Sequence, residues 1–200
     1  MDRRRLLQLI AAGSLPGLLA ACGERKPQFS AVDLTGADYA KDFQLTDQNG
    51  QVRTLKDFKG KLVVLFFGYT QCPDVCPTTM AELAQARKLM GPDGEKVQGL
   101  FVTIDPERDT PELLKAYMTN FDPSFLALRG SPEQLAALAK DFKVFYKKVD
   151  GKTPGSYTMD HSAASYVYDT QGRLRLYTRY GGGAQSLASD LQLLLKHSEA

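Results

Sequence analysis

Two cysteines and one distant histidine are the residues of this chain whose types and spacing indicate chemistry. Cys72 and Cys76 lie in FGYTQCPDVCPTTM, and each is followed by a proline. Such a pair can form a disulfide, act as a redox dithiol, or supply two thiolate ligands to a soft metal ion. His161, far downstream, would supply a third ligand. Two thiolates and an imidazole suit copper, whereas a structural zinc site needs a fourth ligand that is not obvious here.

The prolines predict how the cysteines are held. A residue that precedes proline is driven away from the helical region. We therefore expect Cys72 in a turn, and Cys76 as the N-cap of a helix that starts at Pro77 and ends near Met90. The helix dipole would then favour the Cys76 thiolate by about 0.3–1 kcal/mol.

The remaining pattern predicts an α/β domain with a mixed sheet covered on both faces, in the order of a thioredoxin-like fold. The extra features are an N-terminal β-hairpin around Asn49-Gly50 and one inserted helix. The expected elements are buried strands in KLVVLFFGY and VQGLFVTID, helices opening at Thr110-Pro111 and Ser131-Pro132, strands ASYVYD and RLRLYTRY, and a final helix with an apolar face of Leu187, Leu191, Leu194 and Leu195.

This topology also places the histidines. We expect His161 in a loop through GKTPGSYTMDHS, which enters the terminal hairpin beside the start of the first helix and would face both sulfurs. Mobility around Gly151 to Gly155 would let the imidazole move. His197 stands near the end of the last helix, where a cation is favourable, and we do not expect it to bind a metal.

The run DPERDTP follows the second buried strand. Asp105 ends that strand and Thr110 caps the next helix, which explains most of the run as connection chemistry. The loop leaves the same sheet edge as the cysteines, where ligands bind in open α/β sheets. We expect Asp105, Arg108 and Asp109 to support the site or contact a partner, and not to bind the metal.

The N-terminus predicts export. Residues 1–21 combine a basic head with an apolar stretch that is too short for the roughly 20 residues of a membrane-spanning helix, and they end in Leu19-Ala20-Ala21-Cys22. This ending resembles a bacterial lipobox, with ordinary cleavage near Ala21 as the alternative. The adjacent arginines leave the twin-arginine and general routes open.

Lipidation of Cys22 would anchor the chain on the periplasmic side of a bacterial membrane, and would leave two thiols in an oxidising compartment. We then expect a lipidated tether over residues 22–42 and one domain over residues 43–200. The formal charge of +2 belongs to the leader, which holds three arginines and one aspartate. The near-neutral remainder has no basic footprint for nucleic acid.

Three blocks of the chain resemble the signatures of the Sco/SenC family: FGYTQCPDVCP, IDPERDTP and DHSAASYVYD. The resemblance covers roughly residues 43–197. It implies a membrane-tethered, thioredoxin-like protein whose copper ligands are Cys72, Cys76 and His161. It also implies a metallochaperone that helps assemble the copper centre of cytochrome c oxidase subunit II. Gln71 departs from the residue more often expected there, but it is not a ligand position.

Three functions compete at this stage. The first is delivery of a copper ion, Cu(I) or Cu(II), to cytochrome c oxidase subunit II or another cuproprotein, which needs no enzymatic turnover. The second is thiol-disulfide exchange by Cys72 and Cys76, which would keep the oxidase cysteines reduced. A periplasmic thiol reductant or copper donor is a further expected partner. The third is a peroxidase, since the residues around Cys76 resemble a peroxiredoxin loop, but Pro73 replaces the threonine that helps bind peroxide.

Overall fold

The computed structural model describes residues 27–198. The expected signal peptide (1–21) and the expected lipid attachment site Cys22 lie outside these described residues. Within residues 27–198, none of the helices combines the length and the apolar character needed to cross a bilayer.

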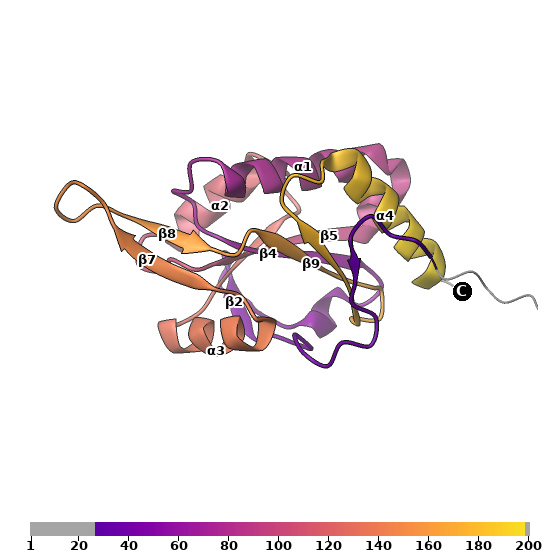
Figure 1. Ribbon diagram of the computed structural model, residues 1–200, viewed down its shortest axis with the longest axis horizontal. Coiled ribbons are helices and arrows are strands. Elements are labelled where there is room, and N and C mark those ends of the chain that lie inside the picture. The colour runs from indigo at the N-terminus through magenta and orange to yellow at the C-terminus, as the bar shows by residue number, and fades with distance from the viewer. Residues whose placement is uncertain (1–26, 199–200) are drawn as a thin grey trace, which may run out of the picture.

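A mixed eight-stranded sheet forms the centre of the domain (Figure 1). The three strands in its middle run parallel, and the other neighbours pair antiparallel. The α/β thioredoxin-like architecture expected from the sequence is therefore confirmed. In spatial order the strands are β1 (Val32–Asp33), β10 (Leu174–Arg179), β9 (Ala164–Tyr168), β4 (Leu62–Gly68), β5 (Val97–Thr103), β6 (Leu126–Arg129), β2 (Leu45–Asp47) and β3 (Val52–Arg53).

The core forms where the chain is continuously apolar. Every residue of β4 and β5 is buried, and the two strands pair in register from Leu62 opposite Val97 to Gly68 opposite Thr103. Burial on both faces explains why their sequences do not alternate between apolar and polar residues. Full burial of each large side chain contributes about 1.5–3 kcal/mol relative to exposure. The ends of these two strands therefore give the site a rigid base.

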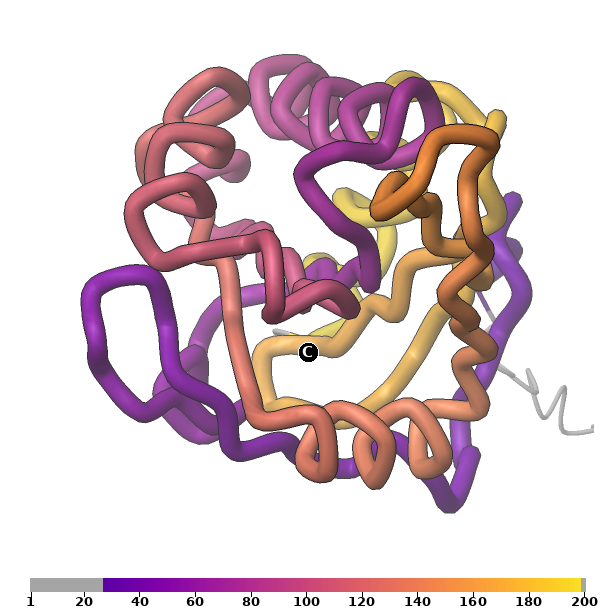
Figure 2. Tube along the Cα trace, turned by 90° about the vertical axis from the view of Figure 1, so that its left-hand side faces the viewer, coloured from indigo at the N-terminus to yellow at the C-terminus, as the bar shows by residue number. Residues whose placement is uncertain are grey.

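Helices cover both faces of the sheet. Helices α1 and α4 pack on each other on one side with α2 beside them, and α3 lies on the other side (Figures 1 and 2). The side chains of Thr110 and Ser131 accept hydrogen bonds from the third helical amide of α2 and α3, so both predicted helix starts are confirmed. The helices are α1 (Val75–Leu89), α2 (Pro111–Thr119), α3 (Pro132–Phe142) and α4 (Ala184–Ser198), with 3-10 turns at Leu55–Phe58 and Gly91–Lys96.

The predicted N-terminal hairpin is confirmed as β2 and β3. Gly50 has φ +81°, a left-handed conformation that favours glycine, and Asp47 accepts the amides of Asn49 and Gln51 across the turn. The hairpin joins the sheet through β6, a strand that the sequence pattern did not predict.

The prediction of a loop over residues 151–162 is wrong. The chain instead forms a second hairpin, β7 (Tyr146–Asp150) and β8 (Tyr157–His161), which is a separate two-stranded sheet projecting from the body (Figure 1). Only the connection between the two strands, residues 151–156, is irregular. Most of the hairpin is exposed, so its strands lack the apolar run by which buried strands are recognised.

The segment expected as a tether also differs in its second half. The amides of Ser30 and Ala31 donate to the carboxylate of Asp190 at 2.9 and 2.8 Å, and β1 pairs with β10. Ala40 is fully buried, and its carbonyl accepts the hydroxyl of Tyr168 at 2.8 Å. Residues 30–42 are therefore part of the folded domain, held largely by backbone hydrogen bonds that leave little trace in hydrophobic periodicity.

Candidate metal centre

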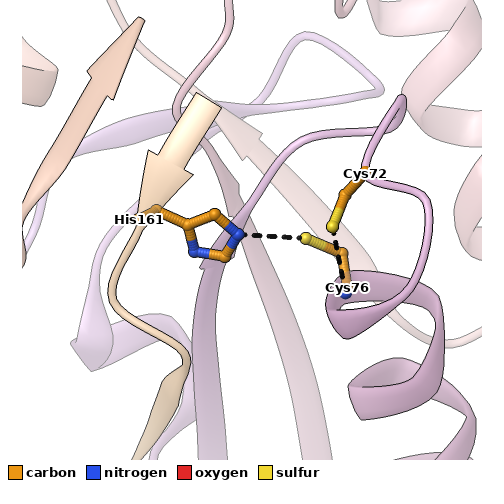
Figure 3. Close-up of side chains that lie close together, drawn as sticks. All are labelled: Cys72, Cys76 and His161. Carbon is orange, nitrogen blue, oxygen red and sulfur yellow. Dashed lines mark hydrogen bonds between the residues drawn. The ribbon is translucent and has the colours of Figure 1, made fainter. Parts of the chain in front are cut away.

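Cys72, Cys76 and His161 meet at one point of the fold, and we call them the ligand triad. Their ligand atoms, two Sγ and one imidazole nitrogen, all lie within 4.8 Å of one another. The shortest separation, 3.4 Å, joins Cys76 Sγ and His161 Nε2, residues that lie 85 positions apart in the chain (Figure 3). Both cysteines are free thiols. One metal ion between these atoms could be bound by all three residues after small adjustments of the side chains.

The sulfurs lie at the start of α1, but not as the prolines predict. The helix begins at Val75 with Asp74 as N-cap, so Cys76 lies in the first turn and the expected N-cap position is wrong. A proline is tolerated within a first turn because amides there have no partner in the helix. The free amide of Cys76 donates to Cys72 Sγ at 3.4 Å. Cys72 thus helps to cap the helix that carries the other sulfur.

Burial controls the charge of Cys76. Its side chain is fully buried, and this burial, followed by the contact with Cys72, raises the pKa of the Cys76 thiol well above its ordinary value. The dipole contribution of about 0.3–1 kcal/mol is too small to reverse this effect. In the metal-free protein, burial therefore favours the neutral Cys76 thiol and outweighs the predicted effect of the helix dipole. Cys72 is partly exposed and is the sulfur that a partner can reach.

His161 presents the form of imidazole that binds metals. Its Nδ1 lies 2.9 Å from the carbonyl oxygen of Ser162, which can only accept, so Nδ1 carries the proton and Nε2 faces the sulfurs with a lone pair. Burial lowers the pKa of His161 and favours the neutral ring. The rings of Phe66 and Tyr69 lie edge-on to the imidazole, at centroid distances of 5.9 and 6.0 Å, and restrict its orientation.

Gly68, the last residue of β4, is a part of the site that the sequence analysis missed. A Cβ atom at this position would lie 2.8 Å from Cys76 Sγ and 2.8 Å from the ring of Phe101. The absence of a side chain therefore creates the space for the buried sulfur. Its position at the end of a buried strand, just before the cysteine motif, was the available signal.

The DPERDTP block supports the cysteine loop, as expected. Asp109 is fully buried and accepts the hydroxyl groups of Thr70 and Thr103, each at 2.5 Å, as well as the amide of Thr70. Burial, only partly offset by these hydrogen bonds, raises the pKa of Asp109. The carboxylate thus ties the loop to the end of β5. Neither Asp105 nor Asp109 joins the ligand triad.

His197 lies apart from the site. It stands in the last turn of α4, where its Nδ1 donates to the carbonyl of Leu193 at 2.8 Å. The predicted position of His197 near the end of the last helix is confirmed.

Comparison with known proteins places this geometry in a family. The SCO1/SenC family model matches residues 32–196. This chain belongs to the SCO1/SenC family. A SCO2-like protein of Rickettsia felis is 36% identical over 168 residues, which are 82% of each chain.

Solved structures of Sco proteins share the fold. ScoI of Bradyrhizobium japonicum with copper bound is 44% identical, with a TM-score of 0.70 over 77% of this chain and 98% of that one. A SCO1/SenC family lipoprotein from Bacillus anthracis is 29% identical, with a TM-score of 0.65 over 76% of this chain and 92% of that one. The present Sco protein thus combines a family-wide fold with a preformed group of two sulfurs and one nitrogen.

Proposed function

We propose that this Sco protein binds copper through Cys72, Cys76 and His161 and delivers it to a cuproprotein. The recipient we infer is cytochrome c oxidase subunit II, whose copper centre the protein would help to assemble. The observation that carries the proposal is the convergence of three ligand atoms within 4.8 Å from two distant parts of the chain. The similarity to a ScoI protein with copper bound supports it.

The donor set favours copper over zinc. Thiolates are soft ligands that suit Cu(I), which accepts three-coordinate sites, whereas structural zinc is almost always bound by four ligands. Within residues 27–198, no further histidine, cysteine or carboxylate joins the group as a fourth ligand. Both thiols lose their protons when the metal binds, since the thiolate is the ligand.

The unequal exposure of the ligands suggests how the ion leaves. Cys76 is buried, whereas Cys72 and His161 are both half-buried. A ligand from the recipient would bind the ion as Cys72, the more accessible sulfur, dissociates, so that the coordination number is kept through each exchange. His161 and Cys76 would be replaced afterwards in the same way.

Copper titration of the reduced mature protein tests the proposal. We expect one Cu(I) per chain in competition with a chelator. Removal of a ligand's hydrogen-bond partner lowers metal affinity by about 10–100-fold. His161→Ala removes a ligand itself, so we expect its Cu(I) affinity to fall by at least this much. His197→Ala is the matched control and should bind like the wild type. Reduced protein that takes up no copper, or equal affinities for His161→Ala and wild type, would contradict the proposal.

Thiol-disulfide exchange is the second candidate, because both cysteines are free and one of them is accessible. In this reaction Cys72 would attack a disulfide of the oxidase subunit. The pair would end as a disulfide while the partner becomes a dithiol. His161→Ala separates the two functions, since it should abolish copper delivery and leave most of the reduction of the partner intact. The peroxidase alternative remains third, and we expect no peroxide consumption.

Anchoring through a lipid on Cys22 at the periplasmic side of a bacterial membrane completes the proposal. The likeness to a family lipoprotein from Bacillus anthracis supports it. Membrane fractionation of cells that express the wild type or Cys22→Ser tests the anchor. The wild type should sediment with membranes, and Cys22→Ser should be released into the soluble fraction.

A further inference from the structure

We propose that Arg108 is a positioning residue that joins the two halves of the copper site and sets how firmly the site retains the metal. This inference rests on the proposed copper function. Its structural part, that Arg108 fixes the position of the strand that carries His161, can be tested without copper.

Arg108 lies between the cysteine loop and the β7–β8 hairpin and binds both. Its Nη1 donates to the side-chain oxygen of Gln71 at 2.9 Å, directly beside Cys72. The same nitrogen donates to the backbone carbonyl of Tyr157 at 3.0 Å, at the first residue of β8. A single guanidinium thus contacts the segment that carries one sulfur and the strand that carries the imidazole.

The guanidinium is itself fixed in place. Its Nε lies 2.5 Å from a carboxylate oxygen of Asp105, which is only 3% exposed. The plane of Arg108 is centred 3.6 Å from the ring of Tyr157, and the Tyr157 hydroxyl donates to the other oxygen of Asp105 at 2.8 Å. Arg108, Asp105 and Tyr157 therefore form a closed set of contacts, in which two nitrogens of the guanidinium and its stacking surface are used.

The hairpin is not part of the main sheet, so its strands are attached to the body by side-chain contacts such as these. Strands β7 and β8 pair only with each other, and they project from the body (Figure 1). A second contact with the same block, Lys148 with Glu107 at 3.1 Å, is largely exposed and contributes little. At the base, the backbone of Phe145 pairs with Ser162. The attachment of the strand at Tyr157 therefore passes mainly through Arg108 and Asp105.

Strand geometry transmits this attachment to the ligand. Tyr157, Met159 and His161 lie on the same side of β8, because side chains two residues apart share a face. These three residues are the buried or half-buried members of the strand, whereas Thr158 and Asp160 are exposed. Arg108 fixes the first residue of this face, and the imidazole is the last. The imidazole is therefore held near the sulfurs before any metal binds, which is the condition for tight binding by preorganised ligands.

The test compares Arg108→Lys with Arg53→Lys. Arg53 also binds a buried aspartate, with Nε 2.8 Å from Asp47, but it lies in the β2–β3 hairpin and has no contact with the ligand triad. Lysine keeps the charge and loses the fork and the stacking plane. For Arg108→Lys we expect Cu(I) affinity to fall by about 10–100-fold, the range seen when ligands lose their supporting partners, with faster copper transfer to a chelator. Arg53→Lys should change both by less than about twofold, since surface changes away from a site are usually small.

Hydrogen exchange of the metal-free protein gives a readout that does not require copper. The amides of β8, Tyr157–His161, should exchange faster in Arg108→Lys and at the wild-type rate in Arg53→Lys. Faster β8 exchange in Arg108→Lys, together with a wild type that binds no copper, would overturn the proposed function alone. Unchanged β8 exchange and unchanged copper transfer in Arg108→Lys would overturn the positioning role.

Gln71→Ala keeps the inference falsifiable if Arg108→Lys does not fold. Gln71 is exposed, so its truncation should not impair folding, and it removes one of the two arms of the contact. We expect faster copper transfer to the chelator with unchanged thermal stability. A transfer rate equal to that of the wild type would count against the role of Arg108.

Discussion

A Cβ atom on Gly68 would lie 2.8 Å from Sγ of Cys76, closer than a carbon and a sulfur atom normally approach. The end of β4 and the first turn of α1 are thus packed without space for one additional methyl group. The buried sulfur occupies a position that only glycine at residue 68 permits.

Gly68→Ala should therefore displace Cys76 and weaken copper binding. Overpacking of this kind costs about 1–3 kcal/mol, which we expect as a loss of unfolding free energy in urea titrations. Cu(I) competition should show a parallel loss of affinity. Gly182→Ala is the control, since the nearest atom to its Cβ would be 3.7 Å away. A Gly68→Ala protein with wild-type affinity would show that the pocket around Cys76 yields easily.

Copper binding should release protons. Burial raises the pKa of Cys76, so its thiol is protonated at neutral pH in the metal-free protein, and the ion must displace this proton. The affinity for Cu(I) should therefore rise with pH over roughly pH 6–8, a range that lies below the ordinary cysteine pKa of about 8.5. Calorimetry in buffers of different ionisation enthalpy measures the protons released, and Cys76→Ser should release fewer. Affinity that is independent of pH would contradict a protonated thiol.

Asp109→Asn should change the pH dependence of stability. Burial raises the pKa of Asp109 in the folded protein above its value in the unfolded chain, near 3.9. The folded state thus binds this proton more tightly, and the contribution of Asp109 to stability falls as the pH rises from the unfolded value through the folded one. Relative to the wild type, Asp109→Asn should gain stability through that interval and keep a constant difference above it. Urea titrations at several acidic pH values measure this difference. A difference in unfolding free energy that is the same at every pH would contradict the prediction.

Asp190→Ala should release the segment around Ser30 from the rest of the domain. Its carboxylate accepts the amides of Ser30 and Ala31, and their loss leaves two donors without this partner. We expect destabilisation by about 1–3 kcal/mol and faster hydrogen exchange at both amides. Ser189→Ala removes only an exposed hydroxyl contact within α4 and should stay within about 0.5 kcal/mol of the wild type.

The sequence patterns were most informative where one local interaction dominates. The unbroken apolar runs predicted β4 and β5, and the Thr110 and Ser131 caps predicted two helix starts. The order of the elements was sufficient to bring His161 toward the cysteines.

The misses arise from individual hydrogen bonds and packing contacts that hydrophobic periodicity does not record. The pre-proline rule placed Cys76 outside the helix, but the amide of Cys76 is satisfied by Cys72 Sγ within the first turn. The exposed strands of the β7–β8 hairpin carry no hydrophobic pattern, and their position depends on Arg108, which belongs to another block. The burial that keeps Cys76 protonated likewise arises from side chains such as Phe66 and Phe101, which line the pocket together with Gly68.

The chain order of the ligands has a temporal consequence. During synthesis both thiols emerge well before the imidazole, and at that stage β4 also lacks β9, its antiparallel neighbour that follows His161. A nascent chain at that point offers a dithiol without its nitrogen donor. Metal loading of the complete centre must therefore come after the terminal strands have been added, and a polypeptide that stops short of β9 cannot acquire the ion in the same way.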